Sequence, residues 1–301
     1  MGKIYLYGMI LSTNSLLLDG VYPEPDGYCE FKKRYFHLGG ETGAAAAILA
    51  SLGCELVLGG THLGTDNNEL IRNYFADKNV DMSGIVYNEN FRGVTDFVII
   101  DKETRTCFGE FGKLYSGSDK WYEAPNEEAI KQCSIVGADS FFGDEFALLC
   151  KKHSKKYATI DSMHDSVITR ECAVIAISHE FLNWKYPDIN YEELMTLYTE
   201  NTDGLVIFTI GSKGAMYSRK GGEIKYCPAF AIDTVSTLGA GDSFKAGTIY
   251  GLSVGMGDDE LVRFACATAA CACMNYPIPL NPPTHEKINK LIKEARYATA
   301  K

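Results

Sequence analysis

A short stretch near residue 240 combines small residues and an acid in a way that suits phosphate chemistry. Gly239-Ala240-Gly241 is followed directly by Asp242 and by an apolar pattern that continues to Leu252, which predicts a glycine-rich turn opening a helix. The first amides of a helix have no intrahelical partner and lie at the positive end of its dipole, so they can bind an anion. Glycine lets a phosphate approach the backbone because it carries no Cβ atom.

Asp242 fits two different roles at this position. A carboxylate beside an anion site would repel a phosphate, unless it removes a proton from the hydroxyl that attacks that phosphate. Phosphoryl transfer requires positioning, charge stabilisation and a base near the nucleophile. The alternative is a tight turn of small residues followed by a capping acid in the first helical turn. Taken alone, the four residues leave both interpretations open.

Two segments of the chain resemble the signatures of one enzyme family. Residues 236–242, Ser-Thr-Leu-Gly-Ala-Gly-Asp, are similar to the C-terminal signature of the ribokinase-like (PfkB-type) carbohydrate kinases. Gly39-Gly40, the alanine-rich segment after it and Gly59-Gly60 resemble the first signature of that family. The two segments occur in the right order, about the right distance apart, in a chain of the right length.

The resemblance implies a fold and an activity. The fold would be an α/β three-layer sandwich around a mostly parallel sheet, with a small β-sheet lid. The activity would be ATP-dependent phosphorylation of a hydroxymethyl group of a sugar or sugar derivative, with Asp242 as catalytic base and Gly239, Ala240 and Gly241 as anion hole. Two alternatives stay open, a nucleoside kinase of the same fold and a non-catalytic sugar- or nucleotide-sensing protein on a kinase scaffold.

The nucleotide contacts implied by the resemblance fall on two loops. Thr209, Gly211 and Gly214 match a Thr-x-Gly-x-x-Gly element beside the nucleotide in the family, and Ser236 and Thr237 precede the anion hole. A glycine loop at the end of a strand is also compatible with a plain turn.

The metal positions are less well matched. Mg²⁺ is required on chemical grounds, because it neutralises the oxygens of ATP. The family's Asn-x-x-Glu element is replaced by Ser178-His179-Glu180, so Glu180 is the candidate for an indirect Mg²⁺ contact. The family's aspartate for a monovalent cation such as K⁺ is replaced by Ser236, which leaves Asp233 as the candidate.

The acceptor side departs furthest from the family. Thr13 stands where the family has an aspartate, and Ala44 where it has an asparagine. Because two hydroxyl-binding groups are replaced, we expect a substrate other than plain ribose. Glu41 could accept hydrogen bonds from hydroxyls or hold a cationic group. The candidates for substrate binding are Asn14, Gly39, Gly40, Glu41 and Arg92, with Asp161 as a further one.

Composition limits the partners and the compartment. A net charge of −10 argues against nucleic acid, because phosphate backbones need a basic face. No apolar run approaches the ~20 residues that span a bilayer, and the N-terminus shows no signal-peptide pattern. We therefore expect a cytoplasmic protein whose ten cysteines are reduced.

The order of the predicted elements indicates a single kinase domain over residues 1–301, with lid strands from about 12–37 and 91–113. Alternating strands and helices after residue 128 indicate βαβ units and a mostly parallel sheet. An exposed edge of the lid makes a homodimer plausible, since unpaired strand edges tend to be covered. Strands are predicted at 3–11, 28–37, 94–100, 106–111, 140–142, 157–160, 173–177 and 205–210, and helices at 145–155, 191–199, 241–252, 258–274 and 284–298.

Overall fold

A mostly parallel sheet forms the centre of the molecule. The computed structural model describes residues 2–102, 104–112 and 120–298. In this part of the chain, nine strands lie in the order β13-β12-β11-β10-β9-β8-β1-β4-β5. Neighbours from β11 to β5 pair in parallel, and β12 and β13 join antiparallel at one end. The strands are β1 (Ile4–Gly8), β4 (Leu56–Gly60), β5 (Val80–Asp81), β8 (Ile135–Ala138), β9 (Lys156–Ile160), β10 (Val174–Ser178), β11 (Leu205–Thr209), β12 (Ala215–Ser218) and β13 (Lys225–Cys227).

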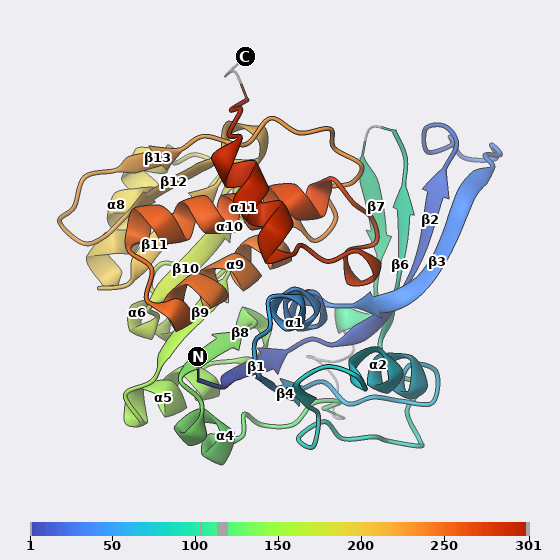
Figure 1. Cartoon of the computed structure of the whole chain (residues 1–301), viewed down its shortest axis with the longest axis horizontal. Coiled ribbons are helices and arrows are strands. Elements are labelled where there is room, and N and C mark those ends of the chain that lie inside the picture. The colour runs from blue at the N-terminus through green and yellow to red at the C-terminus, as the bar shows by residue number, and fades with distance from the viewer. Residues whose placement is uncertain (1, 103, 113–119, 299–301) are drawn as a thin grey trace.

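Helices cover both faces of this sheet, so the predicted three-layer α/β architecture is confirmed (Figure 1). Parallel strands buried on both faces read as continuous apolar runs, as Ile4–Gly8 and Val174–Ser178 do. One face carries α1 (Glu41–Ser51), α2 (Asn68–Phe75), α9 (Ala240–Val254), α10 (Asp258–Cys273) and α11 (His285–Lys293). The other face carries α4 (Glu127–Gln132), α5 (Glu145–Lys152), α6 (Val167–Glu171), α7 (His179–Lys185) and α8 (Tyr191–Asn201).

The strand predicted at residues 140–142 is wrong. Ser140–Phe142 form a 3₁₀ helix, and the strand is the preceding run Ile135–Ala138, which pairs with β1 and β9. All four residues of β8 are buried, whereas Phe141 is 49% exposed. The two adjacent phenylalanines look like a strand core in sequence, but only one of them enters the core.

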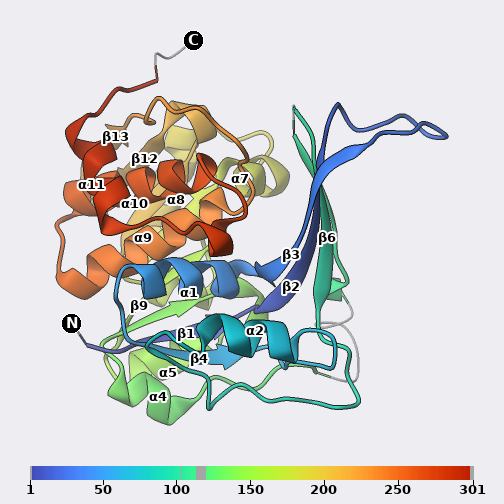
Figure 2. The ribbon, with the colours of Figure 1, turned by 45° about the vertical axis from the view of Figure 1, so that its right-hand side comes forward.

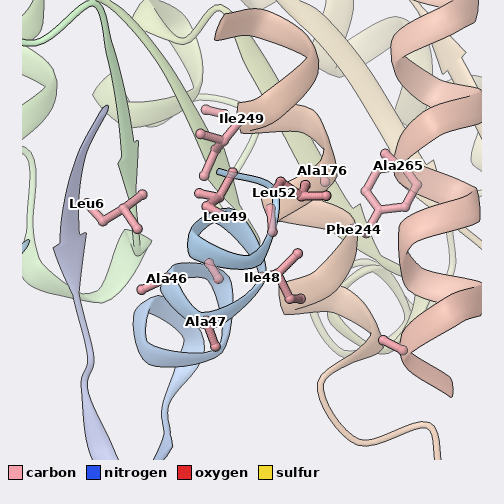
Figure 3. Close-up of a cluster of buried hydrophobic side chains, with 14 of the residues drawn as sticks. Leu6, Ala46, Ala47, Ile48, Leu49, Leu52, Ala176, Phe244, Ile249 and Ala265 are labelled. Carbon is pink, nitrogen blue, oxygen red and sulfur yellow. The ribbon is translucent and has the colours of Figure 1, made fainter. Parts of the chain in front are cut away.

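Small residues determine how closely α9 packs against α1 and α10 on the same face of the sheet. The alanines of α1 let this helix pack closely against α9 and the sheet, with Ile48, Leu49 and Ile249 in the same cluster (Figure 3). A Cβ atom on Gly247 would come within 2.6 Å of the Ala265 Cα, so α9 and α10 touch backbone to backbone there. This packing fixes the direction in which the N-terminus of α9 points.

A second, four-stranded sheet projects from the body of the molecule (Figure 2). Its order is β3-β2-β6-β7, from β2 (Leu11–Leu18), β3 (Phe31–Gly39), β6 (Thr95–Ile100) and β7 (Arg105–Phe108). Its first two strands lie between β1 and α1 in the chain, and the other two lie between β5 and α4. A small second sheet is therefore present as predicted, inserted at two places into the α/β core.

Three further features bear on the sequence-based expectations. Within the described ranges, no helix combines the length and the apolar character that a membrane crossing requires. All ten cysteines are free thiols, and Cys266 and Cys271 are buried in α10. The last helix, predicted to run to residue 298, ends at Lys293.

Candidate active site

The candidate site lies where the chain order of the sheet reverses. β1 is flanked by β4 on one side and by β8 on the other, and crevices at the carboxyl ends of such strands are the usual ligand sites of open α/β sheets. A cavity of about 220 Å³ opens there, between the sheet edge, the start of α9 and the second sheet. Among the described residues its lining comprises Met9, Leu11, Thr13, His37, Leu38, Gly39, Gly40, Glu41, Ala44, Asp96, Phe111, Phe141, Leu238, Gly239, Asp242, Tyr276, Ile278 and Pro279.

The N-terminus of α9 faces this cavity without a capping side chain. Gly239 is the N-cap residue in the left-handed region (φ 76°), and a Cβ atom on it would come within 2.6 Å of Ile278 Cδ1. By contrast, the Ser178 side chain accepts a hydrogen bond from Phe181 N and caps α7. The open first turn of α9 thus leaves amides free for an anion.

Asp242 lies in this first turn and contributes to the cavity lining. Burial, together with the charges of Asp139 and Asp161, raises the pKa of Asp242 to about 6, although Lys245 and Arg105 act in the opposite direction. A carboxylate with a pKa near neutrality can both accept and release a proton under ordinary conditions. Its position and its pKa therefore fit a general base.

A buried ion pair behind Asp242 was not anticipated from the sequence. Lys245, one turn further along α9, is 1% exposed and its Nζ donates a very short hydrogen bond to Asp139 Oδ1. The other carboxylate oxygen of Asp139 accepts from Met9 N (2.6 Å) and Thr42 Oγ1 (3.0 Å). A lysine inside the apolar pattern of residues 244–252 was the signal that could have revealed this pair.

Of the predicted acceptor residues, three line the cavity. Gly39 ends β3, Gly40 is the N-cap of α1 with φ 85°, and Glu41 is the first residue of that helix. A Cβ atom on Gly40 would come within 2.4 Å of the Met9 carbonyl oxygen, so this turn requires glycine. Burial first, and then the charge of Asp139, raises the pKa of Glu41 well above its usual value.

Asn14 and Arg92, also predicted as acceptor residues, are absent from the described lining. Thr13 and not Asn14 faces the cavity from β2, because neighbouring strand residues point to opposite faces. The side chain of Arg92 is 87% exposed and its Nη2 forms an ion pair with Asp66 at 2.8 Å. Asp161 lies beyond the end of β9, where it accepts hydrogen bonds from Ser178 N (2.7 Å) and Ser178 Oγ (3.0 Å).

Three further polar residues on the cavity wall were missed by the sequence analysis. Asp96 of β6 lies directly beside Thr13 of β2, and burial raises the pKa of Asp96 to about 6. Burial lowers the pKa of His37, so its ring is neutral and Nδ1 donates to the Leu38 carbonyl oxygen at 2.7 Å. Tyr276 approaches the other ring nitrogen of His37 at 3.4 Å.

The residues predicted to contact the nucleotide lie on two loops, one after β11 and one before α9. Thr209 ends β11, and Gly211 begins a 3₁₀ turn with φ 53°. Gly214 has φ 98°, and a Cβ atom there would come within 2.1 Å of the Cys227 carbonyl oxygen. Packing against β13 is therefore a sufficient reason for glycine at position 214.

The second loop runs from β13 to α9 and contacts the second sheet through one hydrogen bond. The Ser236 hydroxyl accepts a hydrogen bond from Leu238 N (3.2 Å), and the Thr237 carbonyl oxygen accepts one from Ala240 N (3.2 Å). Arg105 of β7 donates from Nη1 to the Thr237 hydroxyl at 2.7 Å. One arginine of the second sheet thus contacts the loop that leads into α9.

The two predicted metal positions are both exposed to solvent. Glu180 lies in the first turn of α7 and its Oε2 is 3.1 Å from His179 Nδ1. Asp233 is exposed in the loop after β13. In the part of the chain that the structure describes, no three His, Cys, Asp or Glu side chains form a group that could hold a metal ion.

Comparison with known proteins places the chain in a family. Residues 11–276 match the family described as pfkB family carbohydrate kinase. The ATP-dependent ribose-1-phosphate kinase of Halopiger xanaduensis is 26% identical over 241 residues, which cover 75% of this chain and 77% of that protein. The 1-phosphofructokinase of Haemophilus influenzae is 43% identical over 67 residues, which cover 22% of this chain and only 21% of that enzyme.

A solved structure extends the likeness to the whole fold. The ribokinase of Arabidopsis thaliana, complexed with ribose and ATP, superposes with a TM-score of 0.79 at 18% identity, over 97% of this chain and 99% of that one. At this identity the likeness concerns the fold. Together with the match over residues 11–276, it establishes that the chain belongs to the pfkB family of carbohydrate kinases.

Proposed function

We propose that the protein is an ATP-dependent kinase that phosphorylates a hydroxymethyl group of a sugar or sugar derivative. The observation that carries this proposal is the position of Asp242, which lines the cavity from the uncapped first turn of α9. A binding protein has little use for a base with a raised pKa at an anion site. An enzyme that deprotonates a hydroxyl beside a phosphate needs both.

In the proposed reaction, Asp242 accepts the proton of the acceptor hydroxyl as its oxygen attacks the γ-phosphorus of ATP. A new O–P bond forms, the bond from the γ-phosphorus to the β,γ-bridging oxygen breaks, and its electron pair leaves with ADP. The amides of Gly239, Ala240 and Gly241 stabilise the charge of the phosphoryl group. Ala240 N donates to the Thr237 carbonyl oxygen at 3.2 Å, and in the proposed complex this amide would donate to a phosphate oxygen instead.

The nucleotide and its metal ion fit the donor set of this region. Thr209, Gly211, Gly214, Ser236 and Thr237 would lie along the nucleotide, where backbone groups suit phosphate oxygens. Mg²⁺ commonly keeps several waters and binds through one or two carboxylates and the phosphates, so an all-protein cage is not needed. Glu180 would contact this hydrated ion indirectly, and Asp233 is proposed for a monovalent cation such as K⁺.

The names of the relatives do not agree on which sugar is phosphorylated. Two of them are named for phosphorylated sugars, a ribose 1-phosphate kinase and a 1-phosphofructokinase, whereas the Arabidopsis thaliana structure holds ribose. A nucleoside acceptor would need an aromatic residue that stacks its base, and three candidates from the sequence, Tyr28, Tyr35 and Phe36, are outside the described lining. The lining contains other aromatic rings, among them Phe111, Phe141 and Tyr276, so a nucleoside remains the alternative acceptor.

We also propose that the second sheet closes over the acceptor as a lid and forms a homodimer contact. Phe36, Phe97 and Phe108 occupy one register row across β3, β6 and β7, and each is 46–56% exposed. Asn14 completes that row on β2. An apolar row on a sheet with two unpaired edges favours burial against a second copy.

An ADP-release assay with Mg-ATP tests the kinase. The acceptors are ketoses, aldoses, inositols, amino sugars and nucleosides, and the variants are Asp242→Asn and, as a matched control, Asp203→Asn, whose side chain is 94% exposed. Asp242→Asn should bind ATP normally and lose about 10²- to 10⁴-fold in turnover, while the control keeps its rate. Near-normal turnover in Asp242→Asn would sink the assignment. ATP binding with no turnover of any acceptor would instead favour a sensor.

A further inference from the structure

The charged groups on the cavity wall are acidic. Among the described lining residues, Glu41, Asp96 and Asp242 carry carboxyl groups, His37 is neutral, and no lysine or arginine takes part. The relatives named for phosphorylated sugars leave open whether the acceptor carries a phosphate. A phosphate bound in this lining would meet carboxylates instead of basic side chains.

The two cations nearest to the site are engaged elsewhere. Lys245 is sealed behind the cavity, with its Nζ bonded to Asp139 and 3.9 Å from Glu41 Oε2. Arg105 is bonded to Thr237, on the loop that leads into α9. The charge of Lys245 is thus neutralised by the carboxylates beneath the cavity, and Arg105 lies on the side where the transferred phosphate would bind.

Two carboxylate oxygens in the cavity lack hydrogen-bond partners. Asp96 Oδ1 and Glu41 Oε2 are both buried from solvent, and neither accepts a hydrogen bond. A buried acceptor without a donor is costly, so such atoms are usually satisfied by protein, water or ligand. Glu41 has the charge of Lys245 nearby, whereas the Asp96 carboxyl group is held by hydrogen bonds from the Thr13 side chain and from its own backbone amide.

Asp96 is directed inward by the geometry of its strand. It lies in register with Thr13, and Thr13 with His37, so the three form one row on the cavity face of the second sheet. Phe97, the next residue, is on the opposite face and 56% exposed. Asp96 is a partly buried residue on an inner strand of the second sheet, and its unpaired Oδ1 points to a ligand contact.

We propose that Asp96 determines acceptor specificity by accepting a hydrogen bond from a hydroxyl or ammonium group of the acceptor, and that it rejects acceptors with a phosphate at that position. This inference rests on the proposed kinase function and names its acceptor class, an unphosphorylated sugar or amino sugar. Asp96 is a binding residue in this scheme, separate from the base Asp242. Selection would follow from charge, because an ionised carboxylate favours an ammonium, accepts from a hydroxyl and repels a phosphate.

The test compares acceptors that differ in one group only. Calorimetric binding without ATP, and kinetics with Mg-ATP, are measured for fructose, 1-amino-1-deoxyfructose and fructose 1-phosphate, and for glucose, 6-amino-6-deoxyglucose and glucose 6-phosphate. The proteins are the wild type, Asp96→Asn and the control Asp19→Asn. Asp19 is a carboxylate next to the second sheet whose partner is the exposed Lys32. Melting curves check folding, and Asp96→Asn should be at least as stable as the wild type.

The expected outcome is a graded loss of affinity. Asp96→Asn should weaken binding of the hydroxyl acceptor about tenfold, because a hydrogen bond to a neutral donor is weakened. It should weaken binding of the ammonium acceptor about a hundredfold, because a stronger charge-assisted hydrogen bond is lost. Binding of the sugar phosphate should be weak in the wild type and should not weaken further. Equal losses for both unphosphorylated acceptors would identify the contact as a hydroxyl one.

Three results would overturn the inference. They are a sugar phosphate as the tightest acceptor of the wild type, an Asp96→Asn variant that behaves like Asp19→Asn, and no binding of any acceptor in the panel. Failure of the kinase function has a different signature. Acceptor binding would then depend on Asp96 as expected, but no ADP would be released.

Discussion

Replacing Lys245 by methionine should move the acidic limb of the pH–rate profile upward. Asp242 must be ionised to act as a base, so turnover should fall as the pH drops through its pKa of about 6. Lys245 holds that pKa down, while Asp139 and burial hold it up. Lys245→Met removes the positive charge and leaves the opposing negative one, so a higher pH is needed to ionise Asp242.

The size of the shift can be estimated from the helix geometry. Asp242 and Lys245 are three positions apart on α9, which places their side chains about 6 Å apart on one face. Two unit charges at about 6 Å in an effective dielectric of about 20 interact by about 3 kcal/mol. One pKa unit corresponds to about 1.4 kcal/mol, so the upper bound is about two units. We expect a shift of about one to two units, since some of the effect is relieved if Asp139 takes up a proton.

The assay is turnover as a function of pH between 5 and 9 at saturating Mg-ATP and acceptor. Lys245→Met should approach the wild-type rate at high pH and lose about 5- to 50-fold in turnover at pH 6, where the wild-type base is half ionised. It should also unfold more easily, because removing one partner of a buried pair costs about 3–5 kcal/mol.

The double variant Lys245→Met/Asp139→Asn separates electrostatics from damage to the fold. It removes both charges of the pair, so its acidic limb should return close to that of the wild type and part of the stability should be regained. The reasoning is refuted if the limb of Lys245→Met coincides with that of the wild type. It is equally refuted if the double variant keeps the upward shift.

Three other variants address the remaining parts of the site. Gly239→Ala should lower turnover about 10²-fold. A Cβ atom at this position would displace the turn against Ile278, and misplacing a residue that positions the substrate costs about that much. An unchanged rate would show that the turn does not position the phosphate. Arg105→Ala should raise the KM for the acceptor about 3- to 10-fold with little change in melting temperature, since it removes one exposed hydrogen bond to Thr237. An unchanged KM would show that this hydrogen bond does not help the second sheet to close over the acceptor. Phe97→Asp should convert a dimer into monomers in sedimentation velocity, and a monomeric wild type would contradict the proposed contact.

The parts that could be predicted from sequence are those in which local pattern and structure coincide. The Gly-Ala-Gly-Asp turn opens a helix because glycine, helix periodicity and a first-turn acid all act within a few residues. The alternation after residue 128 likewise predicts parallel strands, since the apolar runs and the helices between them are local features. These signals were sufficient for the three layers, apart from the displaced strand at 140–142.

The polar wall of the cavity required knowledge of strand parity and of distant contacts. Asn14 was predicted to bind the substrate, yet Thr13 faces the cavity, and a shift of one residue exchanges the two faces of a strand. Asp139 and Lys245 are 106 positions apart in the chain, so nothing local links them. Asp96 could not be predicted for the same reason, because the direction of its side chain towards the cavity depends on how β6 pairs with β2.

Because the second sheet is inserted at two places in the α/β core, the residues proposed for phosphoryl transfer and those proposed for acceptor binding lie on different segments of the chain. The groups proposed for phosphoryl transfer lie on α9 and the ends of the main strands, whereas Thr13, His37 and Asp96 belong to the inserted strands. If the proposed roles hold, substitutions in the inserted strands would alter which molecule is bound without disturbing Asp242 or the first turn of α9. Such a division lets a lineage exchange one acceptor for another by a few mutations while the chemistry is inherited intact. The same division makes the inserted strands the natural target for engineering a new substrate range.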